Sequence, residues 1–301
     1  MIKGLYESVK QNKTAGKRYW SIQYKLHKLI ANTVYPLIQR GNRERGVDAG
    51  HEIIVSLTTT PARIGKVWIT LCTLLNQTYK PKRIILWLAR EQFGDETALP
   101  KSLLAIQKRG VEIAWCEDLK PHKKYFYTMQ QNPEEIIVTA DDDVLYPENL
   151  LEILIKGHEK YPQAVCCTYA HEIGLTEDGK IAKYSRWKSI EEENKLSLRT
   201  MPVGCGGVLY PPHVLDEELF CKEKIQKLCF MMDDLWLKSM AVRNNTPAVK
   251  LGKGSLIYFD IVGTRKSGLQ HSNAGQGQND VAMQAICTFY PEVEQRLNQK
   301  R

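Results

Sequence analysis

Three consecutive carboxylates, Asp141, Asp142 and Asp143, follow directly on the apolar, β-branched run at residues 136–140. A run of this length and composition predicts a buried strand. Pro147 and the apolar spacing beyond it predict a helix after a short turn. The three acids therefore lie where a buried strand emerges, which is the edge at which open α/β sheets bind ligands.

Side chains alternate along a strand, so the pattern predicts that Asp141 and Asp143 point one way and Asp142 the other. Two carboxylates held this close repel each other unless a cation lies between them. A hard divalent ion, Mn²⁺ or Mg²⁺, suits such a pair, because it keeps one or two carboxylates and completes its coordination with water and substrate phosphates. The alternative is an acidic turn in which Asp143 or a neighbour caps the following helix.

A second pair of carboxylates, Asp233 and Asp234, precedes residues with helical apolar spacing. One interpretation makes Asp233 the N-cap of a helix and puts Asp234 in its first turn. The other gives one of them a catalytic role, as a general base or as a group that orients a reactant and stabilises developing positive charge. Both interpretations can hold at once, since a helix N-terminus fixes a carboxylate in place.

The charge of the 301-residue chain is uneven. Its 42 Lys and Arg residues exceed its 34 Asp and Glu residues by eight, and much of the excess falls in the first 50 residues. This asymmetry predicts an anionic partner for the N-terminal segment. Membrane lipid and a polyanionic product are the two candidates, and no nucleic-acid partner is predicted.

The eight cysteines show no Cys-x-x-Cys spacing and mostly fall in apolar runs. This usage predicts reduced core residues of a cytoplasmic protein, although an even count leaves disulfides formally open. No apolar run approaches the length needed to span a bilayer, and the first residues do not resemble a signal peptide. The expected location is the cytoplasm, with peripheral contact on the inner face of the plasma membrane left open.

The remaining patterns predict a mostly parallel sheet sandwiched by helices. Strands are expected at 52–57, 84–88, 111–115, 136–140 and 164–169, and helices alternate with them. We divide the chain into a basic helical N-terminal segment, residues 1–48, and one main domain, residues 49–301. Within that domain, residues 49–145 form the half that ends with the aspartate triplet, and residues 146–301 form the other half, which includes a polar, glycine-rich lid.

Residues 17–40 have apolar side chains at roughly helical intervals, interleaved with Lys and Arg. One interpretation is an amphipathic helix that lies on an anionic membrane surface. The other is a helix packed on its own catalytic domain with its charges solvated. The sequence leaves both open.

The ordered set of motifs resembles a known family. It comprises a Thr-rich turn ending in Pro-Ala-Arg at 61–63, the segment Asp-Asp-Asp-Val-x-Tyr-Pro at 141–147, a glycine-rich strand with Val-Leu-Tyr at 204–212, and the acid pair at 233–234. Over roughly residues 50–270 this order is similar to nucleotide-diphospho-sugar glycosyltransferases of the GT-A fold. The likeness is to the bacterial α-N-acetylglucosaminyltransferases of heparosan-type capsules and, more distantly, to exostosin-like transferases.

The resemblance implies a role for each matching residue. Asp141 or Asp142 would face the donor ribose, and Asp143 would hold the metal that bridges the diphosphate, with Asp141 as its partner. Thr58, Arg63 and one of the adjacent lysines Lys123 and Lys124, with Lys124 preferred, are assigned to donor binding. The resemblance also makes residues 49–145 the nucleotide-sugar half of the domain and residues 146–301 the acceptor half. From the chemistry of a leaving diphosphate we also expect a cation clamp in the polar tail and a weaker metal ligand nearby, namely Arg265, Lys266 and His271.

The expected function is metal-dependent transfer of a sugar, with retention, from a UDP-sugar such as UDP-N-acetylglucosamine to a bacterial surface polysaccharide or lipid-linked glycan. An inverting enzyme that uses another nucleotide sugar is one alternative. A non-catalytic subunit that binds donor or polymer in a synthase complex is another. A sugar nucleotidyltransferase would need a glycine-rich phosphate loop after the first strand, where residues 58–61 read Thr-Thr-Thr-Pro instead.

Overall fold

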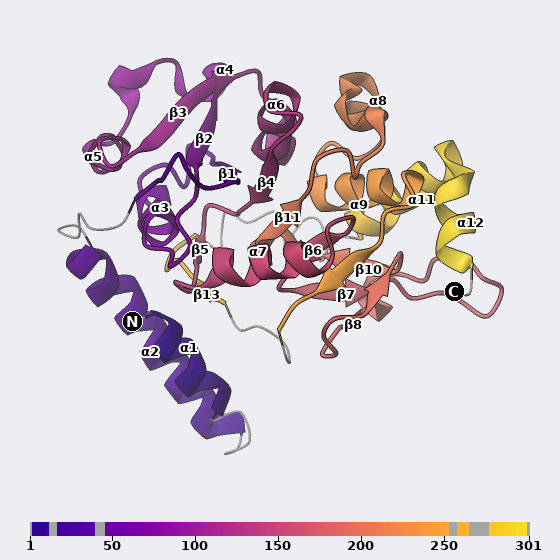
Figure 1. Ribbon diagram of the computed structural model, residues 1–301, viewed down its shortest axis with the longest axis horizontal. Helices are drawn as coiled ribbons and strands as arrows, with labels where there is room; N and C mark the ends of the chain where they lie inside the picture. Colours follow the sequence, from indigo (N-terminus) through magenta and orange to yellow (C-terminus); the bar gives the residue numbers. More distant parts are fainter. Residues whose placement is uncertain (1, 12–16, 40–45, 253–257, 265–276, 300–301) are drawn as a thin grey trace.

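The computed structural model describes residues 2–11, 17–39, 46–252, 258–264 and 277–299 (Figure 1). Its main feature is an eight-stranded sheet with the order β3-β2-β1-β4-β11-β6-β12-β9. The strands of this sheet are β1 (Ile53–Thr58), β2 (Arg83–Ala89), β3 (Val111–Cys116), β4 (Ile136–Thr139), β6 (Val165–Cys167), β9 (Leu196–Ser197), β11 (Val208–Tyr210) and β12 (Ala248–Lys250). Two small sheets consist of β10 (Thr200–Pro202), β7 (Ala170–Glu172) and β8 (Lys188–Ser189), and of β13 (Phe259–Asp260) and β5 (Val144–Leu145).

Six strands of the large sheet run in one direction. β3, β2, β1 and β4 pair in parallel, and β6 and β12 share their direction, because β11 lies antiparallel to both β4 and β6. β9 is antiparallel to β12. The start of β11 therefore lies at the same edge as the carboxyl end of β4. The predicted mostly parallel sheet is confirmed.

Helices cover both faces of this sheet. The apolar residues of α3, α5 and α7 join one buried cluster, and those of α6, α8, α9, α11 and α12 join another. The helices are α1 (Ile2–Gln11), α2 (Lys17–Gln39), α3 (Val67–Leu75), α4 (Arg90–Phe93), α5 (Lys101–Gln107), α6 (Lys123–Gln131), α7 (Leu150–Lys160), α8 (Lys222–Leu228), α9 (Asp233–Arg243), α11 (Gln278–Phe289) and α12 (Pro291–Asn298). Short 3₁₀ turns are η2 (Glu96–Ala98), η3 (Lys120–His122), η4 (Tyr184–Arg186), η5 (Gly204–Gly206) and η6 (Glu217–Phe220).

Strand β1 shows why an apolar run of this kind marks a central strand. Ile53, Val55 and Leu57 belong to the cluster under α3, whereas Ile54 faces a separate buried cluster on the other side. Side chains alternate between the two faces of a strand. When helices cover both faces, every position of the strand is buried and favours an apolar residue.

The two N-terminal helices lie together beside the main body (Figure 1) and pack on the ribbon of β5 and β13. Tyr6 Oη donates to the Leu145 carbonyl and accepts from the Phe259 N–H, each at 2.6 Å. Lys28 of α2 forms an ion pair of 2.6 Å with Asp260. These contacts confirm the packed interpretation of residues 17–40 for one face of the helix.

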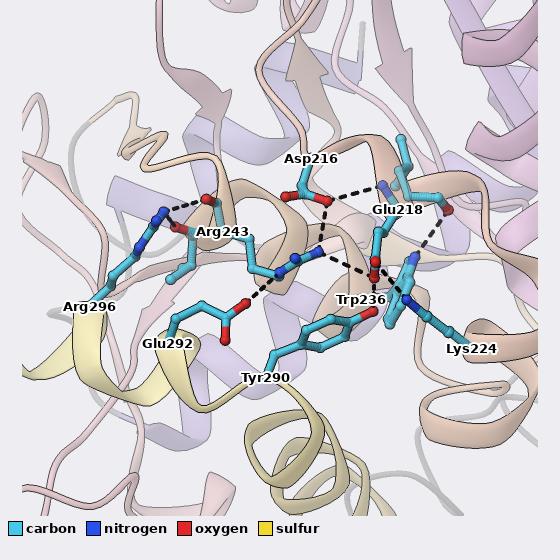
Figure 2. Close-up of polar contacts among 10 residues, drawn as sticks. Asp216, Glu218, Lys224, Trp236, Arg243, Tyr290, Glu292 and Arg296 are labelled. Carbon is cyan, nitrogen blue, oxygen red and sulfur yellow. Dashed lines mark hydrogen bonds and ion pairs between the residues drawn. The ribbon is translucent and has the colours of Figure 1, made fainter.

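A polar cluster fixes the carboxyl end of α9 (Figure 2). Arg243 forms ion pairs with Asp216 (2.7 Å) and Glu292 (2.8 Å), and its guanidinium lies 4.1 Å from the ring centre of Tyr290. Arg296 donates to the Arg243 carbonyl, one of the acceptors left free where a helix ends. The cluster ties α9 to α12 and η6, and so holds in place the helix whose first residues are the Asp233–Asp234 pair.

One buried charge weakens this fold. Lys238 of α9 is 3% exposed, and within the described ranges its Nζ has no hydrogen-bond partner. Burial lowers its pKa from 10.5 to about 7. The unfolded chain therefore binds more protons than the folded chain between these values. The penalty is largest at and below pH 7 and disappears as the pH rises through 10.5.

We expect Lys238→Met to raise the free energy of unfolding at pH 7 by roughly 3 kcal/mol, because it removes this penalty and keeps the side-chain volume. Urea denaturation at pH 7, and at the highest pH the protein tolerates, would measure a gain that shrinks with pH. The exposed Lys156→Met is the matched control and should change stability little at either pH, because it removes only a surface ion pair with Glu152. An equal gain at both pH values would mean that the charge of Lys238 is not the cause.

Most of the cysteines are buried, as the sequence predicted. Cys72, Cys116, Cys166, Cys167 and Cys229 are buried, whereas the other three are partly exposed. No helix in the described part of the chain combines the length and the apolarity that crossing a bilayer requires.

Candidate active site

The aspartate triplet begins two residues beyond β4, which ends at Thr139. The predicted alternation of the three side chains is therefore wrong, because Asp142 and Asp143 lie in a turn rather than on the strand. Thr70 of α3 fixes this turn: its hydroxyl lies 2.9 Å from the carbonyls of both Asp142 and Val144.

Arg63 binds two of the three carboxylates. Its guanidinium lies 2.5 Å from Asp142 Oδ1 and 3.0 Å from Asp143 Oδ2. The Thr59 hydroxyl donates to the other oxygen of Asp142 at 2.5 Å. Burial raises the pKa of Asp142, and burial raises that of Asp143 to about 7, while Arg63 opposes both shifts. The turn after β1 thus supplies the cation that faces the end of β4, because the two strands are parallel neighbours and end at the same edge of the sheet.

Lys124 joins the third aspartate to the second carboxylate pair. Its Nζ lies 3.0 Å from Asp141, 2.6 Å from Asp233 and 3.6 Å from Asp234, and its side chain is 6% exposed. Burial alone would lower the pKa of Lys124, but the three carboxylates raise it well above its ordinary value. Lys124 stands in the first turn of α6, which follows the carboxyl end of β3. One buried ammonium therefore holds two acid groups that lie about 90 positions apart in the chain.

A glycine turn holds Asp234 from the other side. The Gly204 N–H donates to Asp234 Oδ2 at 2.9 Å. A Cβ added at Gly204 would lie 2.8 Å from both Asp234 Oδ1 and Lys124 Nζ, closer than real Cβ contacts. Burial raises the pKa of Asp234 to about 7, although Lys124 opposes the shift. The absence of a side chain at 204 thus lets the backbone approach the carboxylate.

The predicted cap of α9 is wrong. The N-cap is Met232, Asp233 is the first helical residue, and no side chain caps the helix. Asp233 turns to Lys124 and Asp234 turns to Gly204 instead. Both acids still lie in the first turn, where the helix dipole favours negative charge.

Two candidates from the sequence have other partners. The Thr58 hydroxyl donates to the Trp87 carbonyl at 2.8 Å, whereas the neighbouring Thr59 reaches the aspartates. Lys123 forms its ion pair with Asp118 and takes no part in the cluster around Lys124. Thr59 was not among the predicted site residues, although it directly follows β1, and the carboxyl ends of parallel strands are where site residues are expected. The donor-binding role of Thr58 stays a prediction.

The cation clamp and the weaker metal ligand predicted in the tail, Arg265, Lys266 and His271, lie outside the described residues, as does most of the predicted lid. The described chain resumes at Gly277, the N-cap residue of α11.

Asp143 and Asp141 are the residues that could hold a divalent ion. In the ranges that the structure describes, no three or more His, Cys, Asp or Glu side chains are grouped as a metal site. An ion that keeps its waters and binds a diphosphate needs only one or two protein carboxylates. Asp143 and Asp141 supply two such carboxylates, which Arg63 and Lys124 already hold in place at the end of β4. The pair therefore fits such an ion.

No protein-family model and no curated protein matches the chain. Solved structures with a similar arrangement include S. aureus TarS, residues 1–349, in complex with UDP, at 13% identity and a TM-score of 0.48, covering 82% of this chain and 70% of that chain. A second structure of the same TarS fragment has 14% identity and a TM-score of 0.43, covering 69% and 59%. A CMP:2-keto-3-deoxy-manno-octonic acid synthetase complexed with CTP has 9% identity and a TM-score of 0.38, covering 78% and 100%. Likenesses this weak assign no function to the chain.

Proposed function

We propose that the chain is a metal-dependent glycosyltransferase. It would move a sugar, N-acetylglucosamine, with retention from a UDP-sugar to a bacterial surface polysaccharide or a lipid-linked glycan. The observation that carries the proposal is the meeting of five carboxylates with the buried Lys124 and the partly buried Arg63 at the edge where β4 ends and β11 begins. Nucleotide and phosphate ligands bind at such switch points of open α/β sheets.

The donor end of the site is built by the aspartate triplet and Arg63. A diphosphate gains negative charge as the bond to the anomeric carbon breaks. Mn²⁺ or Mg²⁺ held by Asp143 and Asp141 would supply Lewis-acid stabilisation of that charge. The ion pair with Arg63 and the hydrogen bond from Thr59 both hold Asp142, so the carboxylates of this turn are positioned before the donor arrives.

The acceptor end is built by Asp234 and its supports. Its carboxylate is held by the Gly204 N–H and by Lys124, which fixes the direction of the remaining lone pairs. With retention, Asp234 would accept a hydrogen bond from the attacking hydroxyl and stabilise positive charge on the sugar. Its pKa of about 7 also suits a general base, which an inverting reaction would need. Lys124 acts as a positioning residue in either case.

The contacts of Lys124 also indicate where the acceptor would bind. Asp233 and Asp234 face the donor site across Lys124, so the acceptor would enter over the first turn of α9. A glycan or lipid-linked acceptor and a cytoplasmic location are parts of the same proposal.

The function is tested by the release of UDP. We expect the protein to release UDP from UDP-N-acetylglucosamine with Mn²⁺ and an acceptor glycan, and to stop when EDTA is added. Saturating donor with Mn²⁺ should also raise the melting temperature by several degrees, since a ligand at a hundred times its Kd stabilises by about 2.7 kcal/mol. NMR of the anomeric proton of the product then distinguishes retention from inversion.

Three other outcomes would replace this proposal. Donor binding without release from any UDP-sugar and acceptor would indicate a non-catalytic subunit. Release from a different nucleotide sugar would change the donor. Pyrophosphate release from a nucleoside triphosphate and a sugar would indicate a nucleotidyltransferase. No binding of any nucleotide would remove the function altogether.

A further inference from the structure

An apolar row faces outward on α2. Six of the ten exposed large hydrophobic side chains in the described part of the chain belong to this helix. Four of them form what we call the outer stripe, with exposed fractions of 63%, 53%, 54% and 66%: Ile22, Leu26, Leu29 and Leu37. Single exposed leucines are ordinary, but a contiguous apolar patch marks an interaction site.

The outer stripe follows one side of the helix, with the exposed Thr33 in the gap between Leu29 and Leu37. Its members are separated by four, three and eight positions, which places them within about 80° of arc and along roughly 22 Å of the axis. The opposite side of the helix packs on the main body through Tyr24, Ala31 and Tyr35. The contacts with the body and the outer stripe therefore occupy opposite faces of one helix.

The charge of α2 indicates which kind of partner covers the outer stripe. Helix α2 contains four Lys and Arg residues and no Asp or Glu. Lys25 is exposed beside Leu26, and the first 50 residues hold ten basic residues against three acids. A second copy of the chain would bring a helix of the same charge to the stripe, which opposes pairing. An apolar row beside an exposed lysine, on a helix that contains no acid, matches an anionic lipid surface, where aliphatic chains enter the headgroup boundary.

We propose that the outer stripe of α2 docks the protein on an anionic lipid surface. The opposite face of the same helix is linked to the candidate active site through polar contacts of β13. Lys28 pairs with Asp260 of β13, and the Ile261 N–H donates to the Asp143 carbonyl at 2.7 Å. Docking would therefore set the distance and tilt of the aspartate triplet relative to the lipid. The docking itself does not depend on sugar transfer.

The test is co-sedimentation of the full chain with vesicles. We expect binding to equimolar phosphatidylcholine and phosphatidylglycerol, and little binding to phosphatidylcholine alone. The double variant Leu26→Ser/Leu29→Ser should lower the partition coefficient by roughly tenfold or more, because two leucines leave the apolar boundary. Lys25→Glu should lower it roughly fivefold and make binding less sensitive to salt.

The matched control is Leu196→Ser/Val281→Ser, which removes two apolar side chains of similar exposure, 48% and 62%, from other surfaces. It should bind like the wild type, and all variants should keep the melting temperature, since only exposed positions change. Equal loss in the control, or no vesicle binding by the wild type, would overturn the proposal. So would a wild-type dimer in sedimentation velocity that the stripe variant dissociates, because a second copy would then cover the stripe.

Discussion

Replacing Asp143 by Asn is expected to lower turnover with a UDP-sugar by roughly a thousandfold or more while the fold survives. The proposed ion loses a charged ligand where the leaving diphosphate gains charge. Asn has nearly the same shape, and Arg63 keeps its ion pair with Asp142. The Asp143→Asn protein should therefore lose activity but keep its fold.

Steady-state UDP release across a Mn²⁺ titration measures this effect, and the melting temperature with and without donor reports on binding. Asp178→Asn is the control, because that carboxylate is exposed on a distant turn and should change neither quantity. Turnover of Asp143→Asn within tenfold of the wild type would place the ion elsewhere.

Replacing Lys124 by Met is expected to damage both stability and activity. The change leaves Asp141, Asp233 and Asp234 facing one another without their shared cation. Removing one partner of a buried ion pair costs about 3–5 kcal/mol, which corresponds to a fall of roughly ten degrees in melting temperature. Turnover should fall by at least a hundredfold, because Asp234 loses a support that fixes its direction.

The pH dependence identifies the cause. Burial already raises the folded-state pKa of Asp234 to about 7, and loss of Lys124 removes the cation that opposes this rise. The penalty is then present at high pH and is relieved as the pH falls through the raised pKa of Asp234. Thermal denaturation at pH 8 and pH 5 should show the difference from wild type shrinking at the lower pH.

Lys120→Met is the matched control for Lys124→Met. Lys120 is more exposed, and its partner Asp118 keeps its ion pair with Lys123. This variant should behave like the wild type. A Lys124→Met protein that melts like the control would show that the three carboxylates have other counter-charges.

Arg63 and Lys124 remove one of the reasons to expect a metal ion. From the sequence, adjacent carboxylates required a cation between them, and an ion was the candidate. In the structure Arg63 and Lys124 already face all five carboxylates, so the fold is compatible with the acids before any ligand binds. The demand for a divalent ion thus comes from the diphosphate chemistry rather than from repulsion among the acids.

The sequence by itself determined most of the central strands and several of the helices beside them. The strands β1, β2, β3, β4 and β6 and the helices α2, α3 and α7 lie where apolar periodicity placed them, because burial on one or both faces acts on residues that are neighbours in the chain. It also placed the acid triplet at a strand end, since a polar run that interrupts a buried strand has to emerge at the sheet edge.

Only the tertiary structure decided which groups meet. That Lys124 joins Asp141 to Asp233, and that Gly204 binds Asp234, depends on the order of strands and on the reversed direction of β11. The outward direction of Leu26 and Leu29 likewise depends on how α2 packs on β13, since both faces of that helix carry apolar residues. Contacts between distant segments follow from the packing of whole elements, and no local pattern of residues encodes them.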